Sequence, residues 1–262
     1  ERPTVGLALS GGSARGFAHI GVLRVLEEAG LRVDAVAGTS MGAVVGALYS
    51  MGYSPSGLTD VAAGRDWGDL FRESVRRPGV WPGAPSEAER HQLSFPLRGG
   101  RPSLPTGLVT GQRVTQALAR LTWHVHPVTD FSRLPIPFRA VATDLETGEA
   151  VVLSEGFLPL ALRASLAVPS VFTPVKMGSR YLIDGGVARN LPAQDVRAMG
   201  ADVVVCSDVT EPPEPADSVG SFLDVLEQTL SFQVERRAVE QRKLCDVLVR
   251  PPLGGLGTYA FD

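Results

Sequence analysis

The chain has 262 residues, of which 44% are hydrophobic and 20% charged, a composition that supports a large buried core and disfavours intrinsic disorder. Its 25 basic and 28 acidic side chains give a net charge of -3, which argues against a broad basic surface for nucleic acid. The two cysteines, Cys206 and Cys245, are too few for a disulfide framework or a zinc cluster.

Short apolar runs alternate with longer amphipathic ones along the chain. The expected strands are residues 5–9, 33–37, 138–142, 181–183, 203–206 and 247–249, and the expected helices are residues 17–29, 42–51, 192–199 and 222–244. Continuous apolar strands separated by helices are typical of a mostly parallel sheet covered on both faces. We therefore expect one α/β domain over residues 1–262, with three layers around a central, mostly parallel sheet.

Residues 77–111 break this pattern because proline and glycine recur throughout them. That density excludes a long helix or a central strand. Loops of this length in a compact domain are usually lids or binding loops. We interpret the segment as a flap over a site, with a purely structural excursion as the alternative.

The pentapeptide Gly38-Thr39-Ser40-Met41-Gly42 has the form G-x-S-x-G and lies between an expected strand and an expected helix. In that context the sharp turn presents the serine hydroxyl, and the two glycines allow a strained backbone and close helix packing. Ser40 also lies at a helix N-terminus, where partial positive charge favours a developing alkoxide. The alternative is a tight turn with a capping serine.

A second glycine-rich segment, Gly11-Gly12-Ser13-Ala14-Arg15-Gly16, follows the first expected strand. Its backbone N–H groups could stabilise an oxyanion, because glycines let the main chain approach a ligand closely. A nucleotide phosphate would be another ligand for such a loop. The segment lacks both the Gly-Lys-Ser/Thr ending of a P-loop and the G-x-G-x-x-G spacing of a dinucleotide site.

The positions of the histidines disfavour a histidine as the base that would activate Ser40. No histidine follows residue 126, whereas the α/β-hydrolase order places one near the end of the chain. His19 is expected to pack in a helix, His91 lies in the flap, and His124 and His126 lack the partners of a metal site. Asp184, followed by Gly185 and Gly186 at the end of a strand, is the preferred base, with Asp34, Asp144 and Asp208 as weaker candidates.

Four blocks together resemble the patatin-like phospholipase family over nearly the whole chain: residues 10–16, residues 38–42, residues 164–169 (Ala-Ser-Leu-Ala-Val-Pro) and residues 184–186 (Asp-Gly-Gly). The resemblance implies Ser40 as nucleophile and Asp184 as its base. It also implies an oxyanion hole in the loop around Gly11, Gly12 and Ser13, supported by Arg15. Ser10 stands where a further glycine is common in the family, so the individual oxyanion donors are left open.

By this resemblance the chain is expected to cleave acyl esters of phospholipids at a membrane surface, to which it binds peripherally, without a metal or organic cofactor. An acyltransferase or thioesterase using the same residues, and a lipid-binding regulatory module with little turnover, are the alternatives. A narrower similarity, in residues 139–144 and 251–262, is to bacterial modules fused to an outer-membrane barrel. It implies secretion or surface display, with a cytoplasmic location and a homodimer both left open.

Overall fold

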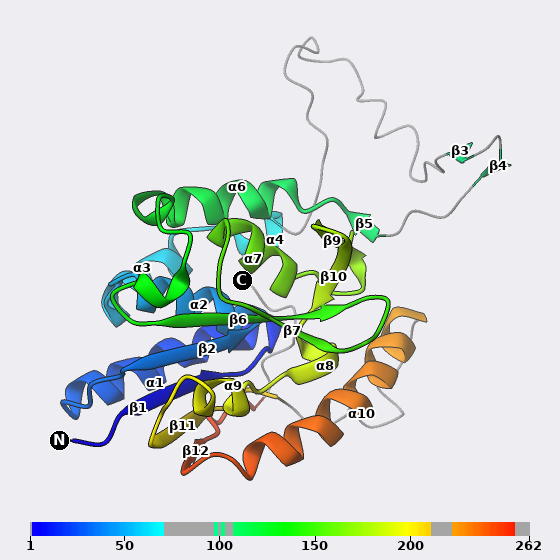
Figure 1. The fold of residues 1–262 in the computed structure, drawn as a ribbon. Helices are drawn as coiled ribbons and strands as arrows, with labels where there is room; N and C mark the ends of the chain where they lie inside the picture. Colours follow the sequence, from blue (N-terminus) through cyan, green and yellow to red (C-terminus); the bar gives the residue numbers. More distant parts are fainter. Residues whose placement is uncertain (1, 71–96, 99–100, 103–106, 211–221, 255–262) are drawn as a thin grey trace.

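A computed structural model describes residues 2–70, 97–98, 101–102, 107–210 and 222–254, and places an eight-stranded sheet at the centre of the molecule (Figure 1). The strand order is β12-β11-β1-β2-β6-β10-β9, with β7 beside β6. These strands are β1 (Val5–Leu9), β2 (Ala35–Thr39), β6 (Phe138–Asp144), β7 (Ala150–Leu153), β9 (Val175–Met177), β10 (Arg180–Asp184), β11 (Val203–Ser207) and β12 (Val247–Val249).

The helices connect these strands and cover the sheet (Figure 1). The α-helices are α1 (Ala18–Glu28), α2 (Met41–Ser50), α3 (Pro55–Ala63), α4 (Trp67–Leu70), α6 (Gln112–Leu121), α7 (Leu158–Ser165), α8 (Gly186–Arg189), α9 (Ala193–Arg197) and α10 (Phe222–Arg242). The described residues also form the short 3-10 helices η1 (Ser13–Phe17), η2 (Trp123–Val125) and η3 (Phe131–Arg133). Within the described ranges, no helix has both the length and the apolar character needed to cross a bilayer.

The five strands from β12 to β6 in the sheet order run parallel to one another. The remaining three, β10, β9 and β7, pair antiparallel at the β6 side of the sheet. Parallel neighbours need long crossover connections, and the helices between them provide these. The expectation of a central, mostly parallel sheet is confirmed.

Alternating side chains of the central strands enter two separate cores. In β1, Leu7 and Leu9 belong to the larger core, which also contains residues of α1, α2, α3, α6 and α7. Ala8, between them, faces the smaller core with Val196 of α9 and Cys206 of β11. A sheet buried on both faces beneath helices is the expected three-layer α/β arrangement.

The second strand begins two residues later than the sequence predicts. Residues 33 and 34 lie before the strand, and Asp34 bonds to Val5 with both its backbone and its side chain. The Asp34 N–H donates to Val5 O at 2.7 Å, and the Asp34 carboxylate accepts from the Val5 N–H at 2.9 Å. Pairing with β1 starts at Ala35 and continues to Gly38. The strand ends at Thr39, directly before Ser40.

The predicted flap, residues 77–111, lies outside the described residues except for residues 97–98, 101–102 and 107–111. Strands β3 (Leu97–Arg98) and β4 (Arg101–Pro102) pair with each other. Strand β5 (Gly107–Val109) pairs with β8 (Ser170–Phe172), apart from the main sheet. The C-terminal end of this segment is thus paired with β8, the strand that follows α7.

Candidate active site

The sheet register aligns three turns at one position across the central strands. Leu9 of β1 pairs with Gly38 of β2, and Thr39 pairs with Val141 of β6. One residue further along β6, Ala142 pairs with Asp184, the last residue of β10. The glycine-rich loop after β1, the serine after β2 and the carboxylate ending β10 therefore lie next to one another.

Ser40 occupies a strained turn between β2 and α2. Its φ of 53° and ψ of -125° lie where side-chain-bearing residues are rare, and such strain is typical of functional turns. The flanking glycines permit the turn: a Cβ on Gly38 would lie 2.4 Å from Gly42 O, and one on Gly42 would lie 2.4 Å from Ser10 O. The two glycines thus let α2 approach both its own strand and β1.

Ser165, from the third sequence block, holds the backbone of this turn. Its Oγ accepts the Ser40 N–H at 2.8 Å and donates to Val141 O at 2.6 Å. Ser165 is fully buried, so both bonds form away from water. Sequence reasoning singled out the block but gave this hydroxyl no role.

Asp184 contacts the Ser40 hydroxyl directly. Ser40 Oγ donates to Asp184 Oδ2 at 2.6 Å, and the N–H of Gly186 donates to Oδ1 at 2.7 Å. Burial raises the pKa of Asp184 to about 6, opposed by the hydrogen bonds from Ser40 and Gly186. The turn requires glycine at residue 185, because a Cβ atom added there would lie only 2.1 Å from Val141 O. The carboxylate therefore accepts the Ser40 hydroxyl hydrogen bond and lies where a general base for that hydroxyl would be needed.

The glycine-rich loop packs against Ser40, since a Cβ on Gly11 would lie 3.1 Å from the Ser40 Cβ. Two of its backbone donors are already engaged: Gly11 N–H donates to Asn190 O at 3.1 Å and Arg15 N–H to Gly12 O at 3.0 Å. Within the described part of the chain, the N–H groups of Gly12 and Ser13 have no acceptor. Of the four residues predicted to form the oxyanion hole, Gly12 and Ser13 are thus the two whose backbone N–H groups are not engaged in the described structure, and the oxyanion role itself stays a prediction.

Hydrogen bonds of Ser10 and His19 hold the residue that directly precedes this loop. Ser10 Oγ accepts the Val209 N–H at 2.9 Å, and Ser10 O lies 2.8 Å from His19 Nε2. His19 Nδ1 lies 2.7 Å from Ser207 Oγ. Burial lowers the pKa of His19 to about 4, so the ring is neutral, with Nε2–H donating to Ser10 and Nδ1 accepting from Ser207. The expectation that His19 is a packed residue is confirmed.

The other histidines and acids considered from sequence are not brought to Ser40 in the described structure. His124 lies against Tyr53, beyond the C-terminal end of α2, whereas Ser40 is at its N-terminal end. His126 packs between Trp123 and Phe157, and His91 lies outside the described residues. The weaker acid candidates bond elsewhere: Asp34 to Arg2, Asp144 to Arg180 and Asp208 to Arg242. The described ranges hold no cluster of three metal-ligand side chains.

The two cysteines form one disulfide, Cys206–Cys245, which joins β11 to the chain just after α10. Sequence reasoning assigned no pairing to them. They are 39 residues apart, and their separation carries no signal that the two segments are neighbours.

Comparison with known proteins places these features in one family. Residues 7–197 match the sequence model of the patatin-like phospholipases, a span that includes the glycine-rich loop, Ser40 and Asp184. The chain belongs to this family. The resemblance drawn from the four sequence blocks is confirmed.

Relatives of this patatin-like chain include proteins much longer than the segment they share with it. An uncharacterised NTE family protein of Mycobacterium bovis is 37% identical over 205 residues, which cover 78% of this chain and 48% of that protein. Patatin-like phospholipase domain-containing protein 6 of Mus musculus is 34% identical over 208 residues, covering 79% of this chain and 13% of that protein. Among solved structures, VipD from Legionella pneumophila is 18% identical with a TM-score of 0.46, covering 87% of this chain and 53% of that one. The chain thus spans about half, or less, of these relatives.

Proposed function

We propose that this patatin-like chain is a serine lipid acyl hydrolase of the phospholipase A or lysophospholipase type, working through Ser40 and Asp184. The observation that carries the proposal is the 2.6 Å hydrogen bond from Ser40 Oγ to Asp184 Oδ2. It joins a strained serine at a helix N-terminus to a carboxylate whose pKa is raised to about 6. Family membership agrees with lipid hydrolysis as the reaction class.

In the proposed reaction Asp184 accepts the hydroxyl proton while Ser40 Oγ bonds to the acyl carbonyl carbon. The N–H groups of Gly12 and Ser13 hold the oxyanion, and the N-terminus of α2 stabilises negative charge at Ser40. The tetrahedral intermediate expels the alcohol, which takes the proton from Asp184. Asp184 then accepts a proton from water, the hydroxide attacks the acyl-enzyme, and the fatty acid leaves as Ser40 regains its proton.

A fluorophosphonate probe combined with a fatty-acid release assay tests this function, because the probe reacts only with an activated serine. We expect labelling at Ser40 and release of fatty acid from phospholipid or lysophospholipid, both abolished in Ser40→Ala. Labelling together with transfer of the acyl group to an added alcohol would favour an acyltransferase. A marked preference for thioesters would favour a thioesterase. Absence of both labelling and release, with vesicle binding retained, would replace the proposal with a lipid-binding module.

We also propose that the chain meets its substrate as a peripheral protein at a bilayer surface. The net charge of -3 offers no general attraction to anionic lipids, so apolar contacts should dominate binding. Co-sedimentation with phosphatidylcholine–phosphatidylglycerol vesicles should change less than twofold between low and physiological salt. A steep loss of binding with salt would instead reveal a local basic patch.

For location, we propose an oxidising compartment outside the cytoplasm, as expected for a secreted or surface-displayed protein. The Cys206–Cys245 disulfide supports this, because structural disulfides persist mainly where thiols are not kept reduced. Rapid alkylation of intact cells, followed by mass measurement, should find both cysteines protected. Two alkylated thiols would point to the cytoplasmic alternative.

A further inference from the structure

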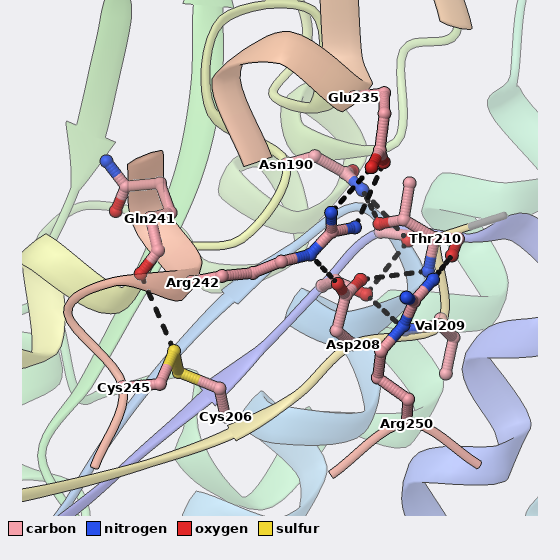
Figure 2. Close-up of polar contacts among 12 residues, drawn as sticks. Asn190, Cys206, Asp208, Val209, Thr210, Glu235, Gln241, Arg242, Cys245 and Arg250 are labelled. Carbon is pink, nitrogen blue, oxygen red and sulfur yellow. Dashed lines mark hydrogen bonds and ion pairs between the residues drawn. A yellow bond between two sulfur atoms is a disulfide. The ribbon is translucent and has the colours of Figure 1, made fainter. Parts of the chain in front are cut away.

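The C-terminal half of α10 and the residues just after it are attached to the C-terminal end of β11 and the residue that follows it at two places (Figure 2). One is the Cys206–Cys245 disulfide. The other is an ion-pair cluster in which Arg242 of α10 bridges Asp208 and Glu235. We call these two attachments together the α10 clamp.

The ion pair between Arg242 and Asp208 is largely buried, the one to Glu235 is partly exposed, and both have short hydrogen bonds. The Asp208 side chain is 0% exposed, and Arg242 Nε donates to its Oδ2 at 2.6 Å. Arg242 Nη1 and Nη2 donate to the two carboxylate oxygens of Glu235 at 2.6 and 3.0 Å. These bonds, first those to Glu235, raise the pKa of Arg242 above its usual range. A lysine could not reach both carboxylates with this geometry, because it lacks the planar fork of three donors.

Asp208 also organises the turn that leaves β11. Its Oδ1 accepts the N–H of Thr210 at 2.9 Å, while its Oδ2 faces Arg242. The Thr210 Oγ1 in turn accepts from Asn190 Nδ2 at 2.7 Å (Figure 2). One buried carboxylate therefore connects α10 to the path taken by residues 208–210.

The same turn is the support of the glycine-rich loop. Ser10 N–H donates to Ser207 O at 3.0 Å, and Val209 N–H donates to Ser10 Oγ. Asn190 Nδ2 reaches Gly11 O at 3.3 Å, and a Cβ on Gly12 would lie 2.5 Å from the Val209 side chain. Glycines have little conformational preference of their own, so this outside support decides where their N–H groups point.

We propose that the α10 clamp positions the glycine-rich loop, with Arg242 as a positioning residue that acts through Asp208 and the turn at residues 208–210. The inference rests on the proposed function for its catalytic consequence, because that function uses the Gly12 and Ser13 N–H groups as oxyanion donors. When the clamp is released, the turn and the loop gain freedom, and the donors are no longer held at the oxyanion. The value of kcat should then fall by a larger factor than the affinity for substrate.

The test compares Arg242→Gln with Arg236→Gln, a change at an exposed arginine on the same helix that makes no ion pair or hydrogen bond within the described residues. Hydrogen exchange of the Ser10 and Gly11 amides reads the loop without requiring turnover. We expect at least tenfold faster exchange in Arg242→Gln, a partial effect in Arg242→Lys and none in Arg236→Gln. With p-nitrophenyl butyrate, kcat should fall about 10- to 100-fold in Arg242→Gln, which is less than the roughly 10²- to 10³-fold loss for removing one oxyanion donor because the donors are loosened and not removed, while KM stays within about threefold. Unchanged exchange in folded Arg242→Gln would overturn the proposal.

Reduction of the wild-type protein provides a second route that needs no substitution. Dithiothreitol gives two electrons and two protons to the disulfide and is itself oxidised to a cyclic disulfide. Because the chain has only these two cysteines, no other bond is changed. We expect faster exchange of the Ser10 and Gly11 amides and a fall in kcat, both reversed on reoxidation. If Arg242→Gln does not fold, unchanged exchange after reduction would overturn the proposal. A protein that shows the exchange response but never hydrolyses an ester would instead contradict the proposed function and leave the clamp standing.

Discussion

Two turns meet at the candidate active site, and they are held in different ways. The turn at Ser40 takes its shape mainly from its own neighbours, since Gly38 and Gly42 allow α2 to lie against β1 and β2, and Ser165 is the distant residue that accepts its N–H. The loop from Ser10 to Ser13 is held by groups far away in the chain, including Asn190, Ser207 and Val209. A turn shaped by adjacent residues can be recognised from a pentapeptide. The loop at residues 10–13, which we call the supported loop, depends instead on contacts with residues nearly 200 positions away in the chain. The two should therefore fail differently when changed.

The largest effect is expected from the carboxylate beside the local turn. Asp184→Asn keeps the shape and the hydrogen bond to Ser40 but cannot accept its proton, so kcat should fall by about 10³-fold or more. In the wild type, kcat should rise with pH through about 6 as the carboxylate ionises, because its pKa is raised to about 6. Esterase assays between pH 4 and 9 measure both. A folded Asp184→Asn variant retaining a tenth of the activity would remove Asp184 as the base.

Packing at the Ser40 turn is tested by Gly42→Ala, with Gly21→Ala as the matched control. The added methyl at residue 42 would lie 2.4 Å from Ser10 O and 2.5 Å from Leu9 O, so α2 must move away from β1. Overpacking of this kind should lower the free energy of unfolding by about 3 kcal/mol. At Gly21, also helical, nothing lies within 4 Å, and the change should stabilise by about 0.5–1 kcal/mol. Urea unfolding measures both, and equal effects would refute the close contact.

The buried carboxylate also makes stability depend on pH. Folding raises the pKa of Asp184 from 3.8 to about 6. The neutral carboxyl group therefore makes its full contribution to the free energy of unfolding below about pH 4. That contribution is lost as the pH rises from about 4 through about 6, amounting to about 3 kcal/mol in the free energy of unfolding. The difference between wild type and Asp184→Asn isolates it from other titrating groups. A difference that is flat with pH over this window would contradict the raised pKa.

The supported loop should be sensitive to Ser10→Ala. This change leaves the buried Val209 N–H without its acceptor and should lower the free energy of unfolding by about 2 kcal/mol. Ser50→Ala is the matched control: Ser50 is equally buried, but among the described residues its Oγ has no hydrogen-bond partner. It should change stability by less than about 0.5 kcal/mol or improve it. Similar losses for both serines, measured by thermal unfolding, would argue against loop support through Ser10.

The smallest effects are expected at the two histidines that lie away from both turns. His124→Gln and His126→Gln should each leave kcat/KM within about twofold of wild type, because neither ring contacts Ser40 or Asp184 in the described structure. The assay on p-nitrophenyl butyrate checks this. Loss of turnover in either folded variant would require a histidine base in place of Asp184.

The features that can be predicted from the sequence are those that depend on residues adjacent in the chain. Apolar runs gave the parallel strands, and the Ser40 pentapeptide and the Asp184 tripeptide gave the two groups that meet at 2.6 Å. Features that depend on tertiary contact could not be predicted: the Ser165 hydroxyl under Ser40, the bond between Gly11 N–H and Asn190 O, and the pairing of Cys206 with Cys245. None of these has a local pattern, since a buried serine or asparagine is ordinary until its partner is known. The strand at residues 35–39 was misplaced by two positions because an apolar run marks burial and not the point where pairing begins.

The separation of Ser40 from Asp184 has a consequence for the timing of folding. The two side chains are 144 residues apart, and they meet only after β2, β6 and β10 have joined in register. Closing loops of that length is slow compared with forming helices such as α2. Chains that have regained their helical content therefore still lack the reactive pair. During refolding, ester hydrolysis should recover later than the far-ultraviolet circular dichroism signal, so that enzymatic activity reports completion of the sheet.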